Sequence, residues 1–389
     1  MQFCAFSETK RTVITMENIS LLIKPSSSLC NMRCKYCFYA DVSNNRLVKS
    51  YGMMTLETLE LLVKKALSEC TGICSFGFQG GEPTLAGLGF YKKLIDFQKE
   101  YNVNHIKINN SIQTNGITIN EEWAVFLKEN NFLAGLSLDG YSDVHNSLRV
   151  DANNEYTYNR VMKAAALFNK YGVEYNILCV VNNFVAKHSE RIIQFFEKNN
   201  FRYLQFIPCI DDLDANKENY SLDNKRYLDF LKITFNHYYY DVMSGNAISI
   251  RNFDNWIGIL MGRPPESCGM LGRCGCYFTV EGDGSVYPCD FYVLDKWRLG
   301  LLTENTFAEM LAGKTSKEFI ESSTPVDEKC KSCNWYNLCR GGCRRYREPF
   351  SKGTPSLNIF CEAYYEFFSF AYDKMINIVK KISNQYLHS

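Results

Sequence analysis

Three cysteines near the start of the chain, Cys30, Cys34 and Cys37, have the spacing of ligands to an iron–sulfur cluster. Three thiolates this close together can hold three corners of a cubane, and they leave the fourth iron without a protein ligand. A cluster that serves only to carry electrons is normally closed by a fourth cysteine. The open corner is available to a small chelating molecule, so the spacing predicts a catalytic cluster. A zinc site or three buried thiols are the alternatives.

The run Gly80-Gly81-Glu82-Pro83 is the second candidate binding element. Two glycines allow a ligand to approach the backbone closely, and the Glu82 carboxylate can accept a hydrogen bond from an ammonium group. Taken alone, the run also suits an ordinary turn between a strand and a helix. It indicates a binding site only if the fold brings it beside the three cysteines.

A second set of cysteines lies between residues 268 and 361, where nine of the seventeen cysteines are found. Little sustained periodicity accompanies them, which indicates a small domain held together by metal and not by a large apolar core. Cys276 follows Cys274 by two residues, so the choice of ligand between these two stays open, and a zinc ribbon is the alternative for the short spacings. Eight thiols are enough for two fully ligated clusters, and the candidates are Cys268, Cys274, Cys289, Cys330, Cys333, Cys339, Cys343 and Cys361.

Residues 17–208 alternate between short β-rich apolar runs and segments of helical periodicity. Such repeats predict a parallel sheet covered by helices, and six strands predict an α/β fold of the partial (β/α)6, TIM-like barrel type. Active sites of such barrels lie at the carboxyl ends of the strands, where the three cysteines and the glycine run both fall. The expected strands are 20–23, 73–78, 106–113, 133–138, 175–181 and 203–207. The expected helices are 55–69, 87–102, 121–130, 157–171, 187–199 and 222–245.

The chain is expected to form three parts. Residues 17–250 would form the barrel, residues 251–362 the small cysteine-rich domain, and residues 363–389 an aromatic C-terminal helix that packs back onto the body. Residues 1–15 are expected to be a loose extension, with Met16 as a plausible alternative start.

The composition excludes several classes of partner. The 43 basic and 42 acidic residues are well mixed, which predicts no nucleic-acid partner, and no apolar run approaches the roughly 18–20 residues needed to cross a bilayer. The first 25 residues lack the basic start and apolar segment of a signal peptide. We therefore expect a cytoplasmic protein that works under anaerobic conditions. The cysteines without ligand spacing are expected to be small apolar residues: Cys4, Cys70, Cys74, Cys179 and Cys209.

The first cysteine motif, together with the aromatic Phe38, resembles the signature of the radical S-adenosylmethionine superfamily. In that family the methionyl amine and carboxylate chelate the open iron, and one electron from the reduced cluster cleaves the sulfonium to a 5′-deoxyadenosyl radical. The resemblance implies that Gly80, Gly81 and Glu82 bind the amine. It also implies that Ser137 and Arg149 hold the ribose and the carboxylate.

The second cysteine set resembles the SPASM extension found on members of that superfamily that modify peptides and proteins. The family's pattern implies two further clusters and therefore three 4Fe–4S clusters in all. One auxiliary cluster would be held by Cys268, Cys274, Cys289 and Cys343, and the other by Cys330, Cys333, Cys339 and Cys361.

The stretch from Tyr287 to Arg298 and the run from Phe78 to Pro83 resemble anaerobic sulfatase-maturating enzymes, and the similarity extends over nearly all of residues 18–380. Those enzymes convert a cysteine or serine of a sulfatase into Cα-formylglycine. The radical takes a hydrogen atom from Cβ, a base takes the thiol or hydroxyl proton, and the auxiliary clusters accept the remaining electron. The resemblance implies Asp290 as the base, with Asp295 as the alternative, and contacts of Tyr39 and Gln79 with the substrate peptide.

The implied partners are an unfolded or nascent sulfatase polypeptide and an electron donor such as flavodoxin or ferredoxin. The nearest alternative is a SPASM enzyme that introduces thioether or carbon crosslinks into another peptide. Such enzymes commonly carry a leader-recognition domain, for which we expect the 29 residues before Cys30 to be too few. A non-catalytic metal or redox scaffold is the alternative from another class. The sequence leaves open whether cysteine-type or serine-type sulfatases are modified.

Overall fold

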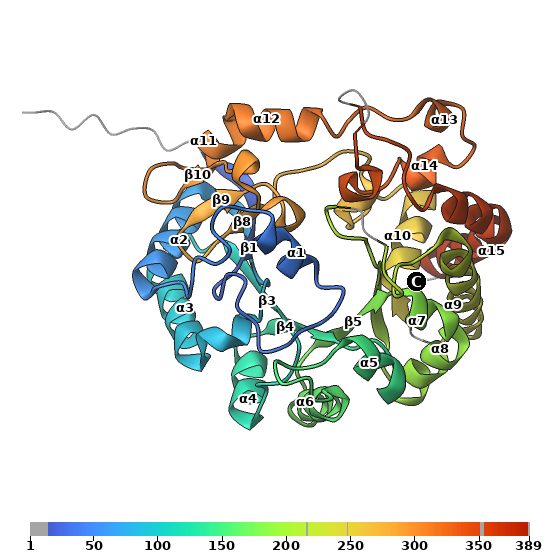
Figure 1. Cartoon of the computed structure of the whole chain (residues 1–389), viewed down its shortest axis with the longest axis horizontal. Helices are drawn as coiled ribbons and strands as arrows, with labels where there is room; N and C mark the ends of the chain where they lie inside the picture. The colour runs from blue at the N-terminus through green and yellow to red at the C-terminus, as the bar shows by residue number, and fades with distance from the viewer. Residues whose placement is uncertain (1–14, 215–216, 247, 351–353, 388–389) are drawn as a thin grey trace, which may run out of the picture.

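The computed structural model describes residues 15–214, 217–246, 248–350 and 354–387, and within these residues its centre is one sheet of ten strands (Figure 1). The strand order is β10-β9-β8-β1-β2-β3-β4-β5-β6-β7, and neighbours from β8 through β1 to β7 are parallel. The parallel series is β1 (Met16–Ile23), β2 (Cys70–Phe78), β3 (Lys107–Thr114), β4 (Phe132–Ser137), β5 (Tyr175–Val181), β6 (Tyr203–Pro208) and β7 (Ser249–Ile250), joined on the other side of β1 by β8 (Phe278–Val280).

Helices cover the outer face of this sheet, because each presents one apolar stripe to it. In α2, for example, the Thr55 hydroxyl caps the first turn by accepting from the Thr58 N–H, and Leu59, Leu62 and Val63 are buried. The outer helices are α2 (Leu56–Glu69), α3 (Leu88–Tyr101), α4 (Glu121–Glu129), α6 (Tyr158–Tyr171), α8 (Ser189–Lys198) and α9 (Asn224–Ser244). Shorter helices near the loops are α1 (Phe38–Asn44), η1 (Pro83–Ala86), α5 (Ser142–Leu148) and α7 (Asn183–Lys187).

The expected partial barrel is confirmed, with two local corrections. The first strand begins at Met16 and not at residue 20, because its polar first half still pairs with β2. The helix expected over 187–199 is confirmed as α8, which begins two residues later, at Ser189, but the short helix α7 before it was not expected. The Asn182 side chain caps a helix that begins at Asn183, and the backbone leaves the helical conformation at His188 before α8 starts.

The cysteine-rich segment continues the barrel sheet instead of standing apart from it. Ile23 of β1 pairs with Val280 of β8, and two antiparallel strands follow, β9 (Ser285–Tyr287) and β10 (Gly300–Leu301). Around them lie short helices, coloured yellow to orange-red in Figure 1. These helices are α10 (Arg251–Leu260), η2 (Cys268–Met270), η3 (Asp290–Tyr292), η4 (Asp295–Trp297), α11 (Phe307–Ala312), α12 (Lys314–Glu321), α13 (Glu328–Lys331), α14 (Tyr336–Cys339) and η5 (Arg344–Arg347).

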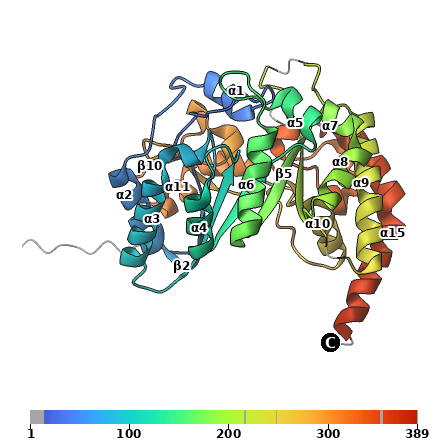
Figure 2. The same ribbon diagram turned by 90° about the horizontal axis from the view of Figure 1, so that it is seen from below.

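The last helix, α15 (Cys361–Leu387), packs back onto the body as expected. Its aromatic side chains meet those of α9 and α10, with ring centroids 5.5 Å apart for Phe235 and Phe367 and 5.0 Å apart for Trp256 and Phe368. Figure 2 shows α15 beside α9, with its C-terminal end projecting beyond the barrel. This packing fixes the position of the helix start, where Cys361 lies.

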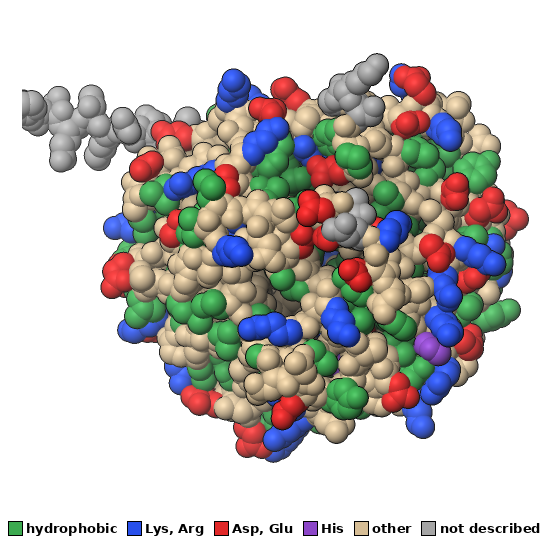
Figure 3. All heavy atoms as spheres, viewed as in Figure 1, with side chains coloured by type: hydrophobic (Ala, Val, Ile, Leu, Met, Phe, Trp, Pro, Cys, Tyr) green, Lys and Arg blue, Asp and Glu red, His purple; other side chains and the backbone are tan. Residues whose placement is uncertain are grey.

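Two further expectations concern the ends of the chain and the membrane. The extension expected over residues 1–15, including Cys4, lies outside the described residues except for Thr15. Across the part of the chain that the structure describes, no helix is long and apolar enough to span a bilayer. The face seen in Figure 3 mixes acidic, basic and apolar side chains.

A buried ion triad joins the barrel to the cysteine-rich segment. Glu281, just after β8, accepts hydrogen bonds from Lys24 Nζ at 2.5 Å and from Arg46 Nη1 at 2.6 Å through the same carboxylate oxygen, Oε1. All three side chains are buried. Burial would raise the pKa of the Glu281 carboxyl, but the two cations hold it below its ordinary value. Burial also lowers the pKa of the Lys24 ammonium, so we interpret the triad as fixing geometry more than adding net stability.

Replacing Glu281 with Gln should lower the free energy of unfolding by about 3–5 kcal/mol, because two buried cations lose their counter-ion. Since the folded pKa of Glu281 lies below the unfolded value of about 4.3, its contribution is complete above that pH and is lost as the pH falls through the folded value. Urea titrations at several pH values measure both effects. Glu122→Gln, which breaks the exposed Lys92–Glu122 pair, should cost less than about 1 kcal/mol. Equal losses of unfolding free energy in the two variants would contradict a special role for the buried triad.

Candidate active site at the mouth of the barrel

The loop that carries Cys30, Cys34 and Cys37 leaves the carboxyl end of β1 and enters α1, for which Cys37 is the N-cap residue. Each of the three thiols lies close enough to the others to interact electrostatically. The Cys30 sulfur accepts from the Met32 N–H at 3.3 Å and faces the Asn115 amide nitrogen at 3.8 Å. Donors of this kind stabilise ligand thiolates.

The chemistry of this thiol set fits a metal cluster. Burial raises the pKa of Cys30 to about 11 and that of Cys34 to about 12 in the metal-free chain. Metal ligation needs thiolates, so the cations of a cluster must supply the stabilisation that burial removes. The Arg149 guanidinium, with Nη1 3.9 Å from the Cys34 sulfur, adds a positive charge beside the site.

Gly80 and Gly81, at the end of β2, allow two chain segments to approach each other closely. A Cβ on Gly81 would lie 2.2 Å from the carbonyl oxygen of Leu29, and a Cβ on Gly80 would lie 2.5 Å from Cε of Lys24. Both glycines also have positive φ values, of +86° for Gly80 and +54° for Gly81. The two glycines are therefore needed for packing within the protein, because they let the cysteine loop lie directly against the end of β2.

The Glu82 carboxylate is engaged mainly by protein donors. Its Oε1 accepts from Thr84 N–H at 3.1 Å, Thr84 Oγ1 at 2.5 Å and Thr114 Oγ1 at 2.7 Å, and its Oε2 accepts from Asn115 N–H at 2.8 Å. The side chain is 1% exposed, and burial raises the pKa of the carboxyl. Glu82 thus organises the end of β3 and directs Asn115 toward Asn31 and the Cys30 sulfur. The sequence predicted that Glu82 accepts from an ammonium group and did not predict these hydrogen bonds to Thr84, Thr114 and Asn115.

Ser137 and Arg149 lie on the same face. Ser137 is the last residue of β4, and its hydroxyl accepts from the Gln113 side chain at 3.0 Å. Arg149 follows α5 and is buried, with Nε donating to Asp139 Oδ2 at 2.9 Å. Asp139 was not among the expected site residues, although it lies only two residues after Ser137.

Asp290 and Tyr39 meet across the two parts of the chain. The Tyr39 hydroxyl, on α1, donates to Asp290 Oδ2 at 3.1 Å, and the Cys289 thiol donates to Asp290 Oδ1 at 3.4 Å. Burial raises the pKa of the Asp290 carboxyl, while these two hydrogen bonds oppose the rise. A carboxylate in this setting can accept a proton from a nearby group. Asp290 therefore lies between the first cysteine loop and the second cysteine set.

The remaining candidates near Asp290 are differently placed. Gln79 precedes Gly80 at the end of β2, is half-buried, and donates its backbone N–H to Ile23 at 2.9 Å. Asp295 is exposed at the surface, where its Oδ2 accepts from the Leu47 N–H at 2.9 Å. Asp295 thus holds a surface loop in place and is more exposed than the half-buried Asp290.

The second cysteine set forms two groups of neighbouring thiols. In the first, Cys289 and Cys343 interact with each other and with Cys268, and Cys274 interacts with Cys268 and Cys343. In the second, Cys330, Cys333, Cys339 and Cys361 interact with one another. Burial raises the pKa of Cys343 and of Cys339 to about 12, so these thiols also need a metal to ionise. The side chain of Cys276 instead lies beside Ser316, away from both groups.

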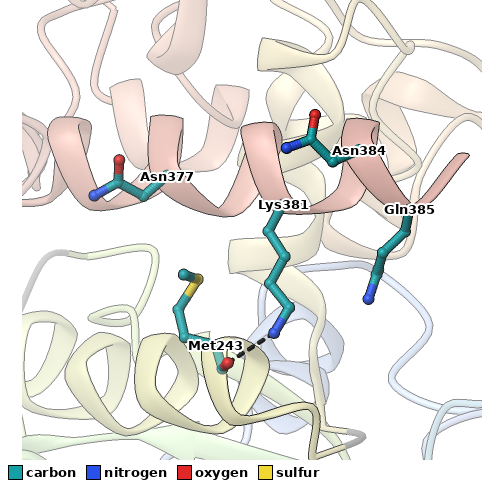
Figure 4. A pocket seen from close by; sticks show the side chains of 5 residues that line it. All are labelled: Met243, Asn377, Lys381, Asn384 and Gln385. Carbon is teal, nitrogen blue, oxygen red and sulfur yellow. Dashed lines mark hydrogen bonds between the residues drawn. The ribbon is translucent and has the colours of Figure 1, made fainter. Parts of the chain in front are cut away.

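A surface hollow between α9 and α15 lies away from these groups. Figure 4 shows its lining, in which Lys381 Nζ donates to the Met243 carbonyl at 2.7 Å, with Asn377, Asn384 and Gln385 alongside. It holds no pair of titratable or nucleophilic side chains. The candidate active site is therefore the barrel mouth.

Comparison with known proteins agrees with this site. A family model described as the radical SAM superfamily matches residues 25–196, and one described as an iron-sulfur cluster-binding domain, SPASM, matches residues 268–334. Fold and site together define a radical S-adenosylmethionine enzyme with a SPASM domain. The chain is 50% identical over 371 residues to a cysteine-type anaerobic sulfatase-maturating enzyme of Clostridium novyi, covering 95% of this chain and 99% of that protein. It belongs to the anaerobic sulfatase-maturating enzymes.

Further relatives and solved structures agree. A serine-type anaerobic sulfatase-maturating enzyme of Bacteroides thetaiotaomicron is 30% identical, over 94% of this chain and 92% of that protein. The structure of native anSMEcpe with bound AdoMet and Cp18Cys peptide matches with a TM-score of 0.90 and 50% identity, covering 94% and 99% of the two chains. SuiB of Streptococcus suis, at 18% identity, covers 90% of this chain and 76% of its own with a TM-score of 0.63, and shares the fold. The chain accordingly carries 4Fe–4S clusters and uses S-adenosylmethionine.

Replacing Gly81 with Ala should abolish assembly of the first cluster and binding of S-adenosylmethionine, because the new Cβ would collide with the Leu29 carbonyl that holds the cysteine loop. Iron analysis after anaerobic reconstitution and equilibrium dialysis with S-adenosylmethionine measure both. Gly245→Ala is the matched control, since Gly245 also has a positive φ but no atom within 4 Å of the added Cβ. That variant should lose about 1–2 kcal/mol of stability and keep its iron. A Gly81→Ala protein with full iron and cofactor affinity would contradict the steric argument.

Proposed function

We propose that this protein oxidises a cysteine side chain of a sulfatase polypeptide to Cα-formylglycine. The observation that carries the proposal is the hydrogen-bonded, half-buried Asp290–Tyr39 pair, which lies between the open cysteine motif and the second cysteine set. Identity of 50% to cysteine-type relatives, against 30% to serine-type relatives, favours cysteine as the residue oxidised. A sulfatase chain enters the barrel mouth as an extended, unfolded or nascent segment.

Three sets of residues hold the cofactors in this proposal. Cys30, Cys34 and Cys37 ligate the first cluster, and the nearby motif residues surround S-adenosylmethionine. Bound together and reduced, the two supply the 5′-deoxyadenosyl radical. Gly80 and Gly81 let the cysteine loop pack closely on the turn that faces the amine, Glu82 orders that turn, and Ser137 and Arg149 face the ribose and the carboxylate.

Side chains of the protein then accept the thiol proton of the substrate. The oxidation removes a hydrogen atom from Cβ, a proton from sulfur and one electron, which leaves a thioaldehyde that water hydrolyses to the aldehyde and hydrogen sulfide. Asp290 accepts the thiol proton, because its half-buried carboxylate is held by Tyr39 at the barrel mouth, between the two cysteine regions. Tyr39 orients the Asp290 carboxylate, and Gln79, at the end of β2, contacts the substrate backbone.

The two remaining thiol groups hold the auxiliary clusters. We assign Cys268, Cys274, Cys289 and Cys343 to one cluster. Cys274 is preferred over Cys276 because Cys274 interacts with Cys268 and Cys343, whereas Cys276 lies beside Ser316. Cys330, Cys333, Cys339 and Cys361 hold the other. Clusters bound at these thiols would supply an acceptor for the electron that leaves the substrate beside Asp290. An external donor such as a flavodoxin or ferredoxin, in the cytoplasm, completes the cycle.

The substrate is tested with two synthetic sulfatase-motif peptides that differ only in carrying Cys or Ser at the modified position. The reconstituted, dithionite-reduced enzyme should convert the Cys peptide at least about tenfold faster than the Ser peptide, because a thiol proton is lost more easily than a hydroxyl proton. Mass spectrometry of the peptides measures formylglycine directly. Modification of neither peptide, with 5′-deoxyadenosine still released, would overturn the proposed function.

Asp290→Asn should retain release of 5′-deoxyadenosine but lower formylglycine formation by about a hundredfold or more, because the thiol proton has no acceptor. The ratio of the two products, followed by chromatography and mass spectrometry, measures the uncoupling. Asp295→Asn, which alters an exposed carboxylate five residues along, should keep the wild-type ratio. Full product yield from Asp290→Asn would remove this residue from the role of base.

A further inference from the structure

Asp139, two residues after the end of β4, is the meeting point of three donors from three elements. Its Oδ2 accepts from Arg149 Nε at 2.9 Å and from the Tyr36 hydroxyl, and its Oδ1 accepts from the Val180 N–H at 3.0 Å. The side chain is 1% exposed. Three good donors in a buried site hold a carboxylate in one orientation.

The ion pair leaves the far edge of the Arg149 guanidinium available. Asp139 binds Nε, while Nη1 faces the Cys34 sulfur at 3.9 Å, and the guanidinium carbon lies 5.5 Å from the centre of the Tyr36 ring. A guanidinium fixed on one edge presents its terminal N–H groups in a fork that matches a carboxylate. The orientation of that fork depends on Asp139.

The backbone of Arg149 is tied to the same network. His145, which is fully buried, accepts the Asp139 N–H through Nδ1 at 3.3 Å and pairs through Nε2 with the Thr157 hydroxyl at 3.0 Å. That hydroxyl donates to the Arg149 carbonyl at 2.8 Å. Burial lowers the pKa of His145 to about 3, so the ring is neutral and one of its nitrogens can accept. Side chain and main chain of Arg149 are therefore both anchored around Asp139.

Tyr36 extends the network into the cysteine loop. It lies between Cys34 and Cys37, so a hydrogen bond from its hydroxyl to Asp139 fixes the segment that carries two of the three thiols. One carboxylate thereby couples the position of the cysteine loop to the position of the Arg149 fork. The sequence motifs alone assign no role to either Tyr36 or Asp139.

From this geometry we propose that Asp139 is a positioning residue for the cofactor: it sets the Arg149 guanidinium and the Tyr36 segment of the cysteine loop so that a carboxylate-bearing sulfonium ligand seats against the first cluster. The inference deepens the proposed function, because it rests on the use of S-adenosylmethionine at this loop. Asp139 acts through Arg149 and Tyr36 and does not itself touch the reacting atoms.

Asp139→Asn tests the proposal in the reconstituted holoenzyme without any peptide. The dissociation constant for S-adenosylmethionine, measured by equilibrium dialysis, should rise about tenfold or more, since loss of a supporting residue behind a ligand typically has effects of this size. Addition of the cofactor should also perturb the electron paramagnetic resonance signal of the reduced first cluster less than in the wild type. Asp254→Asn is the matched control, because Asp254 also accepts from a tyrosine hydroxyl, that of Tyr238 at 2.7 Å, but lies on α10. It should leave affinity and signal unchanged.

A double-mutant cycle separates positioning from a general structural role. Because Asp139 acts through Arg149 and Tyr36, adding Asp139→Asn to Arg149→Met should weaken binding of S-adenosylmethionine by no more than the roughly threefold expected for loss of the Tyr36 contact, well below its tenfold effect in the wild type. Tyr36→Phe removes one donor to Asp139 and keeps the ion pair with Arg149, so it should weaken binding of S-adenosylmethionine by a smaller factor, about threefold. This variant tests the same network if Asp139→Asn fails to take up iron.

Additive effects in the cycle, or wild-type affinity in Asp139→Asn, would overturn the inference. So would wild-type affinity in Tyr36→Phe if Asp139→Asn cannot be loaded with iron. A wild-type enzyme that binds S-adenosylmethionine but modifies no sulfatase peptide would refute the proposed function alone and leave the role of Asp139 standing.

Discussion

The parallel pairing of β8 with β1 sets the geometry of the whole barrel mouth. The first cysteine loop leaves the carboxyl end of β1, and the chain reaches Cys289 and Asp290 by way of β8 and β9. The register that places Ile23 opposite Val280 therefore determines how far Asp290 lies from Tyr39 on α1. A shift of one residue would turn the side chains of β8 to the opposite face of the sheet. The buried Glu281 triad lies at this junction and opposes such a shift.

Three buried carboxylates and the half-buried Asp290 have different tasks because they have different partners. Glu281 is neutralised by two cations, and Asp139 by one cation and two neutral donors. Glu82 is held by neutral donors alone, and Asp290 by the Tyr39 phenol and, in the chain without metal, by the Cys289 thiol. The first two thus hold structure in place. Asp290 has the fewest partners and is the one that we propose as the base.

The barrel and the cysteine groups could be predicted from the sequence, because both leave local signals. Strands and helices follow from the apolar period, and ligand cysteines follow from short spacing and family resemblance. The long-range contacts could not be read in this way. Lys24 and Glu281 are 257 residues apart, and neither local sequence indicates that the two side chains form an ion pair. Asp139, Thr114 and Asn115 were missed for the same reason, since their roles arise from strand ends that become neighbours only in the folded sheet.

The helix α15 starts at Cys361, which also completes the second group of four thiols. This helix contributes Phe367 and Phe368 to an aromatic seam against α9 and α10. The aromatic seam and the thiol group therefore meet at one residue. Packing of α15 on α9 and α10 sets where the Cys361 sulfur lies relative to the other three thiols before any metal is bound.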